Sequence, residues 1–114
     1  MDILFIFKVI CALATVATGA ISLIAPRSIK GFTGLEAAGP RGITEIRAVM
    51  GGLFIGLGIA PFLLAFPQVY QTLGIMYLAI AVVRTVSMFL DRSVMQSNIL
   101  SLIVEVVFGI ILVV

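Results

Sequence analysis

The sequence predicts an all-α integral membrane protein, a polytopic antiparallel bundle of four transmembrane helices in a single domain, residues 1–114. Hydrophobic residues make up 62% of the 114 residues, and charged residues make up only 11%. A soluble domain is about half apolar and about a quarter charged. Because so few charges could not cover so much apolar surface in water, lipid is the solvent that fits this composition. A chain of this length allows one domain.

Four windows of the sequence have the length and apolar character of a membrane-spanning helix, which needs about 20 mostly apolar residues. At a rise of about 1.5 Å per residue, each window gives roughly 30 Å of helix, enough to cross the hydrocarbon layer. The windows cover residues 3–24, 44–66, 69–90 and 93–114.

The first window is expected to be a retained helix rather than a cleaved signal peptide. It ends in small residues at 17–20, but Asp2 precedes Lys8, which makes a poor basic start for a signal peptide. Cys11 is the single cysteine and therefore cannot form an internal disulfide. It lies in an apolar run, so we interpret it as a packing residue, with lipid modification as the alternative.

The connections predict which helices are antiparallel neighbours and on which side of the membrane the connections and the termini lie. The short links after residues 66 and 90 favour antiparallel neighbours. The connection 25–43 is longer and rich in glycine and proline, so no long helix is expected there. The first and third connections carry most of the basic residues near the helix ends: Arg27, Lys30, Arg41 and Arg92. The excess of positive charge on cytoplasmic loops places these connections in the cytoplasm and both termini outside it.

Two rows of residues at a spacing of four predict close helix contacts. Small residues let helix backbones approach in lipid, where no hydrophobic force drives association. The row in the second window is Ala48, Gly52, Gly56 and Ala60. The row in the fourth window is Ser97, Ser101, Glu105 and Gly109. The first row fits packing within the bundle, and also a dimer face or a ligand groove. The second row is the least apolar face of its helix and is expected to point inward.

Four ionisable residues within or at the ends of the windows form the candidate site: Glu45, Arg47, Arg84 and Glu105. Charges inside a spanning segment are costly and usually face protein or water. Arg84 lies about 10 Å, and Glu105 about 12 Å, from the third connection, so adjacent antiparallel helices bring them to one level. Glu45 and Arg47 start the second helix at the same end. The four residues suit a structural ion-pair network, or a pocket for a lipid headgroup, a carboxylate or a small polar molecule.

Several classes of function are disfavoured by the composition. The chain has no His and one Cys, so zinc, haem and iron–sulfur sites have almost no ligands, and no metal or cofactor is expected. The formal net charge of +2 is too small and too scattered for nucleic-acid binding. No nucleophile–base pair accompanies the glutamates, so an enzyme is not expected.

The segment around the second window carries a family resemblance. Residues 42–53 read GITEIRAVMGGL, and residues 56–58 read GLG. This resembles the bacterial four-helix membrane proteins of the domain of unknown function 4345, which have the pattern G-x-x-E-x-R-A-x-Y-G-G. Glu45, Arg47 and Gly52 match motif positions, while Met50 stands where a tyrosine is usual and removes a hydroxyl group. The resemblance covers nearly the whole chain. It implies the four-helix fold and a bacterial inner membrane, with a distant similarity to the DoxX-like proteins, and implies no activity.

Two functions are compatible with these features. The first is an accessory or assembly subunit of a larger membrane complex, because the loops are minimal and the helices carry small-residue faces. Its partners would be membrane lipids and other subunits, or further copies of the chain. The alternative is a protein that binds a lipid or a small polar ligand through the arginines and glutamates within the membrane.

Overall fold

The computed structural model describes residues 2–114, and the ordered elements in this range are all helices. Four of them are long and apolar enough to span a membrane, with mean hydropathies of 1.8 to 2.2. They are α1 (Ile3–Ile24), the α3–α4 run (Pro40–Leu64), α5 (Pro67–Leu90) and α6 (Gln96–Val113). The protein is therefore a multi-pass, all-α membrane protein, and the predicted fold class is confirmed.

The α3–α4 run changes its helix type along its length. It begins as α3 (Pro40–Glu45), continues as the π-helical segment η2 (Ile46–Leu53) and ends as α4 (Phe54–Leu64). A π-helix has i→i+5 hydrogen bonds and usually appears only as a single turn, often near functional positions. The motif that carries the family resemblance runs through this π-helical segment.

Three of the helices start at residues that differ from the expected ones. The second and third spanning helices begin at Pro40 and Pro67, earlier than expected, because proline suits the first turn of a helix. The fourth begins at Gln96, later than expected, because residues 91–95 form the turn that leaves α5. Arg92 in this turn has a φ of 51°, a left-handed conformation that ends the preceding helix.

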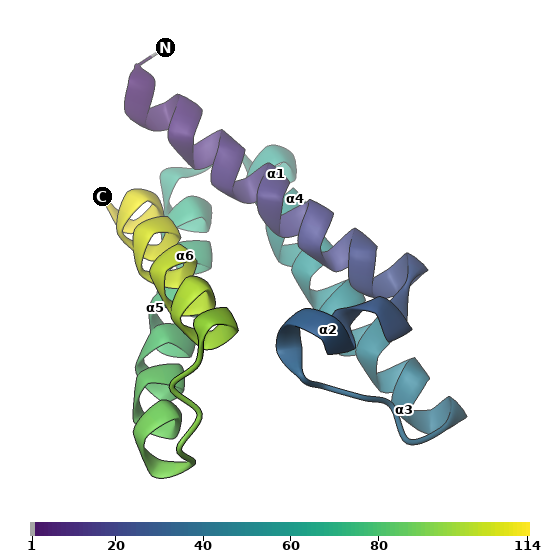
Figure 1. Ribbon diagram of the computed structural model, residues 1–114. Coiled ribbons are helices and arrows are strands. Elements are labelled where there is room, and N and C mark those ends of the chain that lie inside the picture. Colours follow the sequence, from purple (N-terminus) through teal and green to yellow (C-terminus); the bar gives the residue numbers. More distant parts are fainter. Residues whose placement is uncertain (1) are drawn as a thin grey trace. The chain divides into compact units, whose positions relative to one another are not determined.

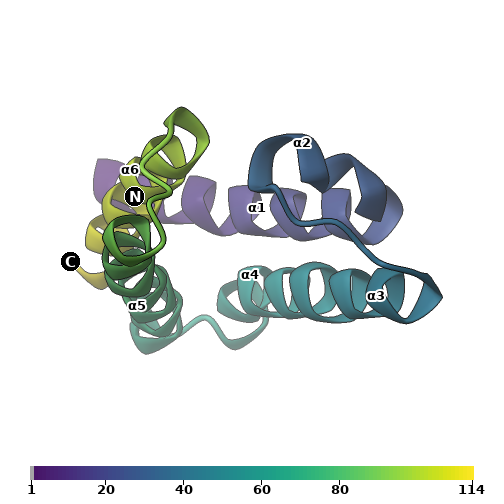
Figure 2. The ribbon, with the colours of Figure 1, turned by 60° about the horizontal axis from the view of Figure 1, so that its bottom comes forward.

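The connection between α1 and α3 contains only short helical turns. These are η1 (Pro26–Ile29) and α2 (Lys30–Thr33), which ends at Gly34 with a φ of 74°. Glycine adopts this left-handed conformation without a steric penalty. Pro26 and Ile29 are buried, and α2 lies beside the C-terminal half of α1 (Figure 2).

The described residues divide into two compact units. The α1–α4 unit comprises residues 12–65, and the α5–α6 unit comprises residues 2–11 together with 66–114. Helix α1 is continuous and contributes its first turns to the α5–α6 unit. The organisation of the whole chain as one domain stays a prediction.

In the α1–α4 unit, α1 and the α3–α4 run lie side by side and antiparallel (Figures 1 and 2). Glycines make the contact. A Cβ atom on Gly19 would lie 2.7 Å from the carbonyl oxygen of Gly51, and one on Gly58 would lie 2.9 Å from that of Ala12. The two helix backbones therefore touch near Gly19 and again near Gly58, as expected for helix packing in lipid.

The predicted small-residue row does not form this contact. Ala48, Gly52 and Gly56 are exposed, and no atom lies within 4 Å of a Cβ atom built on Gly56. Gly52 lies about a quarter of a turn from Gly51 around the helix axis, so the row points to one side when Gly51 faces α1. Gly51 and Gly58 take its place. The row as a packing face for another partner stays a prediction.

In the α5–α6 unit, α5 and α6 form an antiparallel pair (Figure 1). A Cβ atom on Gly74 would lie 3.0 Å from the carbonyl oxygen of Gly109, so the helices approach closely there. Tyr77 meets Phe108 edge to face, with ring centroids 5.4 Å apart. These contacts hold α5 and α6 in one register, which fixes the level of the side chains nearer the connecting turn.

Candidate functional site

Arg84 of α5 and Glu105 of α6 form an ion pair in which the carboxylate is buried and the guanidinium is partly buried. Arg84 Nε donates to both carboxylate oxygens of Glu105, at 2.9 and 3.0 Å, and Nη2 donates to Oε2 at 2.7 Å. The side chain of Glu105 is 9% exposed and that of Arg84 is 30% exposed. This side-on, two-pronged geometry is the strong form of an arginine–carboxylate contact.

Asn98 completes the arrangement, and we call Arg84, Glu105 and Asn98 the Arg84 cluster. Arg84 Nη1 donates to Asn98 Oδ1 at 2.9 Å, and Asn98 Nδ2 donates to the carbonyl oxygen of Ser93 at 2.8 Å. Asn98 thereby ties the cluster to the turn between α5 and α6. Asn98 was not among the site residues predicted from the sequence. The spacing could have indicated it, because Asn98 lies two helical turns before Glu105 and therefore shares a face of α6 with Glu105.

The local sequence explains how two charges can reach this depth. Arg84 lies six residues before the end of α5, or about 9 Å along the helix. Glu105 lies one turn before Gly109, where the absence of a side chain lets α5 come close. Glu105 and Gly109 are both buried, so the polar row of the fourth window faces α5 at these positions.

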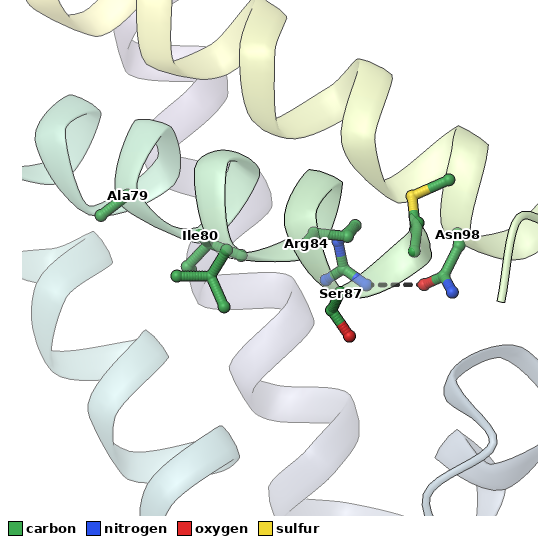
Figure 3. A pocket seen from close by; sticks show the side chains of 7 residues that line it. Ala79, Ile80, Arg84, Ser87 and Asn98 are labelled. Carbon is green, nitrogen blue, oxygen red and sulfur yellow. Dashed lines mark hydrogen bonds between the residues drawn. The ribbon is translucent and has the colours of Figure 1, made fainter. Parts of the chain in front are cut away.

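A cavity of about 450 Å³, open on the surface of the α5–α6 unit, adjoins the Arg84 cluster (Figure 3). Six of its lining residues belong to α5 and the seventh to α6: Ala79, Ile80, Val83, Arg84, Ser87, Met88 and Asn98. Figure 3 shows Arg84 and Asn98 joined by their hydrogen bond, with Ala79 and Ile80 further along α5. The cavity therefore has an apolar stretch on one side of Arg84 and polar side chains at its other end.

Ser87 contributes an oxygen to the polar end of the cavity. Its Oγ donates to Asp91 Oδ2 at 2.6 Å, so its proton is engaged. The lone pairs of the hydroxyl oxygen remain able to accept a hydrogen bond.

The other two predicted site residues lie in the α1–α4 unit. Glu45 pairs with Arg41, one turn earlier on the same helix, at 2.8 Å, and both side chains are more than half exposed. Arg47 is exposed in the first turn of the π-helical segment. A cluster that joins Glu45 and Arg47 to Arg84 and Glu105 would bridge the two units, and it stays a prediction.

A second, smaller cavity lies in the connection between α1 and α3. Its volume is about 160 Å³, and it is lined by Arg27, Lys30, Leu35, Glu36 and Ala37. Lys30 pairs with Glu36 at 3.2 Å, and both side chains are largely exposed. Exposed pairs of this kind contribute little to stability. Among residues 2–114, no group of three His, Cys, Asp or Glu residues could hold a metal ion.

The comparisons with known proteins give one family. No curated protein and no solved structure matches the chain. The family model of the domain of unknown function (DUF4345) matches residues 3–114, a range that includes both α5 and α6 and the motif at 42–52. The more distant DoxX-like similarity stays a prediction. Since the match extends over nearly the whole sequence, the chain belongs to the DUF4345 family.

Proposed function

We propose that this protein binds a lipid or a small polar molecule in the cavity beside Arg84. The observation that supports this proposal is the cavity itself, which adjoins a charged side chain within a membrane-spanning helix. Charged residues at such positions are costly and generally mark a functional site or pathway. Ligand cavities have volumes of about 300–1,000 Å³ and combine apolar walls with a few polar groups, and this cavity has both properties.

The structural alternative is that the Arg84 cluster only fixes the register of α5 and α6. A register-fixing ion pair needs well-placed partners, but it needs no groove beside it. Arg84 is 30% exposed and lines the cavity, whereas its partner Glu105 is covered. This asymmetry favours a role for the guanidinium group beyond pairing.

The Val83→Trp variant is expected to lose the bound molecule, because an indole ring would occupy the cavity that Val83 lines. Val82→Trp is the matched control, because the side chain of Val82 is 65% exposed, close to the 68% of Val83, but does not line the cavity. The measurement is mass spectrometry of compounds extracted from the protein after purification in a mild detergent. Identical extracts from both variants and the parent would support the structural alternative.

We propose as a second function that the protein is an accessory or assembly subunit of a larger membrane complex. It is supported by the small-residue row, in which Ala48, Gly52 and Gly56 are exposed, Ala60 is half-buried, and all four present little side-chain bulk. Such faces allow close contact with another helix in lipid.

A pull-down from native membranes tests this second proposal. Gly56→Leu is expected to release a co-purifying membrane partner or a second copy of the chain, because the new side chain blocks close approach. Ile59→Leu, an exposed change on the same helix, is expected to retain it. A parent protein that purifies alone, as a monomer, would overturn the proposal.

We also propose that the protein resides in the bacterial inner membrane with both termini outside the cytoplasm. The support is the distribution of basic residues, with Arg27, Lys30, Arg41 and Arg92 in two connections against Lys8 on the terminal side. A C-terminal reporter enzyme that is active only outside the cytoplasm would test this orientation. Activity of a strictly cytoplasmic reporter at the same position would reverse it.

A further inference from the structure

We infer that the molecule in the Arg84 cavity is a membrane glycerolipid, bound through the carbonyl oxygen of an acyl ester. This inference rests on the proposed ligand-binding function and narrows it to one class of ligand. It follows from the hydrogen-bonding groups that remain in the cavity, from the charge of the Arg84 cluster and from the direction in which polarity changes along α5.

Arg84 and Asn98 bring hydrogen-bond donors to the polar end of the cavity, beside the oxygen of Ser87. A guanidinium group has five N–H groups, and the bonds to Glu105 and Asn98 use three of them. Asn98 Nδ2 has two N–H groups and gives one to Ser93. The remaining donors call for a ligand that brings acceptor oxygens.

The charge of the cluster selects an uncharged acceptor. Arg84 and Glu105 already neutralise each other at 2.7 Å. A ligand carboxylate or phosphate would add a negative charge without a counter-charge in a segment where such charges are costly. A cationic group would meet the guanidinium of Arg84. A carbonyl oxygen accepts hydrogen bonds and brings no net charge.

The depth of the cavity matches the position of an ester group in a lipid. The 24 residues of α5 span about 36 Å, slightly more than the hydrocarbon layer of about 30 Å. Arg84 lies about 9 Å from the end of α5, which puts its side chain within reach of the boundary between headgroups and acyl chains. Ser87 lies nearer that end, whereas Ala79, Ile80 and Val83 extend toward the bilayer centre. A lipid with its ester at Arg84 would lay its acyl chain along this apolar wall.

The test uses two synthetic lipids that differ only at the predicted contact. The parent protein is exchanged into micelles containing a diacyl phosphatidylethanolamine or its dialkyl ether analogue, with the same headgroup and chain length. Lipid retention is then measured by native mass spectrometry. We expect the ester lipid to be retained about tenfold better, because the ether lacks the carbonyl acceptor for the remaining donors of Arg84 and Asn98. Val83→Trp should abolish this preference, and Val82→Trp should keep it.

The outcomes separate this inference from the function on which it rests. The parent could retain the ester and ether lipids equally, while Val83→Trp loses both. This result would overturn the carbonyl contact, and lipid binding in the cavity would still stand. A third set of micelles contains a free fatty acid, and its preferential retention over the ester lipid would overturn the charge argument. If neither lipid is retained, and Val83→Trp extracts match those of the parent, both the inference and the proposed function are wrong.

Discussion

Replacing Glu105 with leucine is expected to destabilise the α5–α6 pair by about 3–5 kcal/mol, the typical cost of removing one partner of a buried ion pair. The change removes the acceptor of three hydrogen-bond contacts from Arg84 and leaves the guanidinium without its counter-charge. Asn98 alone cannot compensate, because its amide carries no charge. The measurement is loss of helical circular dichroism during titration of mixed micelles with a denaturing detergent.

Two further variants show whether the loss comes from the unpaired charge. Glu105→Gln keeps an acceptor oxygen and should fall between the parent and Glu105→Leu. The double variant Arg84→Leu/Glu105→Leu removes both charges and should recover most of the stability, since apolar replacements of buried ion pairs are often neutral or stabilising. A Glu105→Leu protein that unfolds at the same detergent fraction as the parent would show that the pair contributes nothing to the fold.

The four spanning helices could be predicted because lipid imposes a simple requirement on the sequence. Each needs a long apolar run, and the windows around α1 and α5 satisfied this almost without interruption. The starts of the helices were harder to place. Pro40 and Pro67 interrupt hydropathy patterns, yet proline is favoured in the first turn of a helix, so the helices begin at these residues.

The Arg84–Glu105 pair was accessible from the sequence because depth along an antiparallel pair can be counted from the connecting turn. The same count did not identify Asn98, whose role depends on the direction of its side chain and on the carbonyl group of Ser93. The cavity was inaccessible for a related reason. Its volume depends on how the side chains of α5 pack, and residue spacing does not determine this.

The small-residue row shows a limit of reasoning from residue spacing. The spacing predicts which residues share a helix face, but it does not predict which of two small-residue faces meets the neighbouring helix. Gly51 and Gly58, which are seven residues apart and outside the row, share another face, and that face meets α1.

Gly19→Ala is expected to destabilise the α1–α4 unit by about 1–3 kcal/mol, the usual cost of overpacking a close contact. The new Cβ atom would lie 2.7 Å from the carbonyl oxygen of Gly51 and 2.8 Å from the backbone nitrogen of Ile55. Because both neighbours are backbone atoms, α1 and the α3–α4 run would have to move apart. Detergent titration followed by circular dichroism measures the effect.

Gly56→Ala is the matched control, because no atom lies within 4 Å of a Cβ atom at this position. It should be neutral or stabilising by up to about 1 kcal/mol, since alanine is the better helix former. If Gly56→Ala were instead as destabilising as Gly19→Ala, the small-residue row would have a packing partner outside the α1–α4 unit. Dependence of that loss on protein concentration would then identify the partner as a second chain, and independence would place it within the same chain.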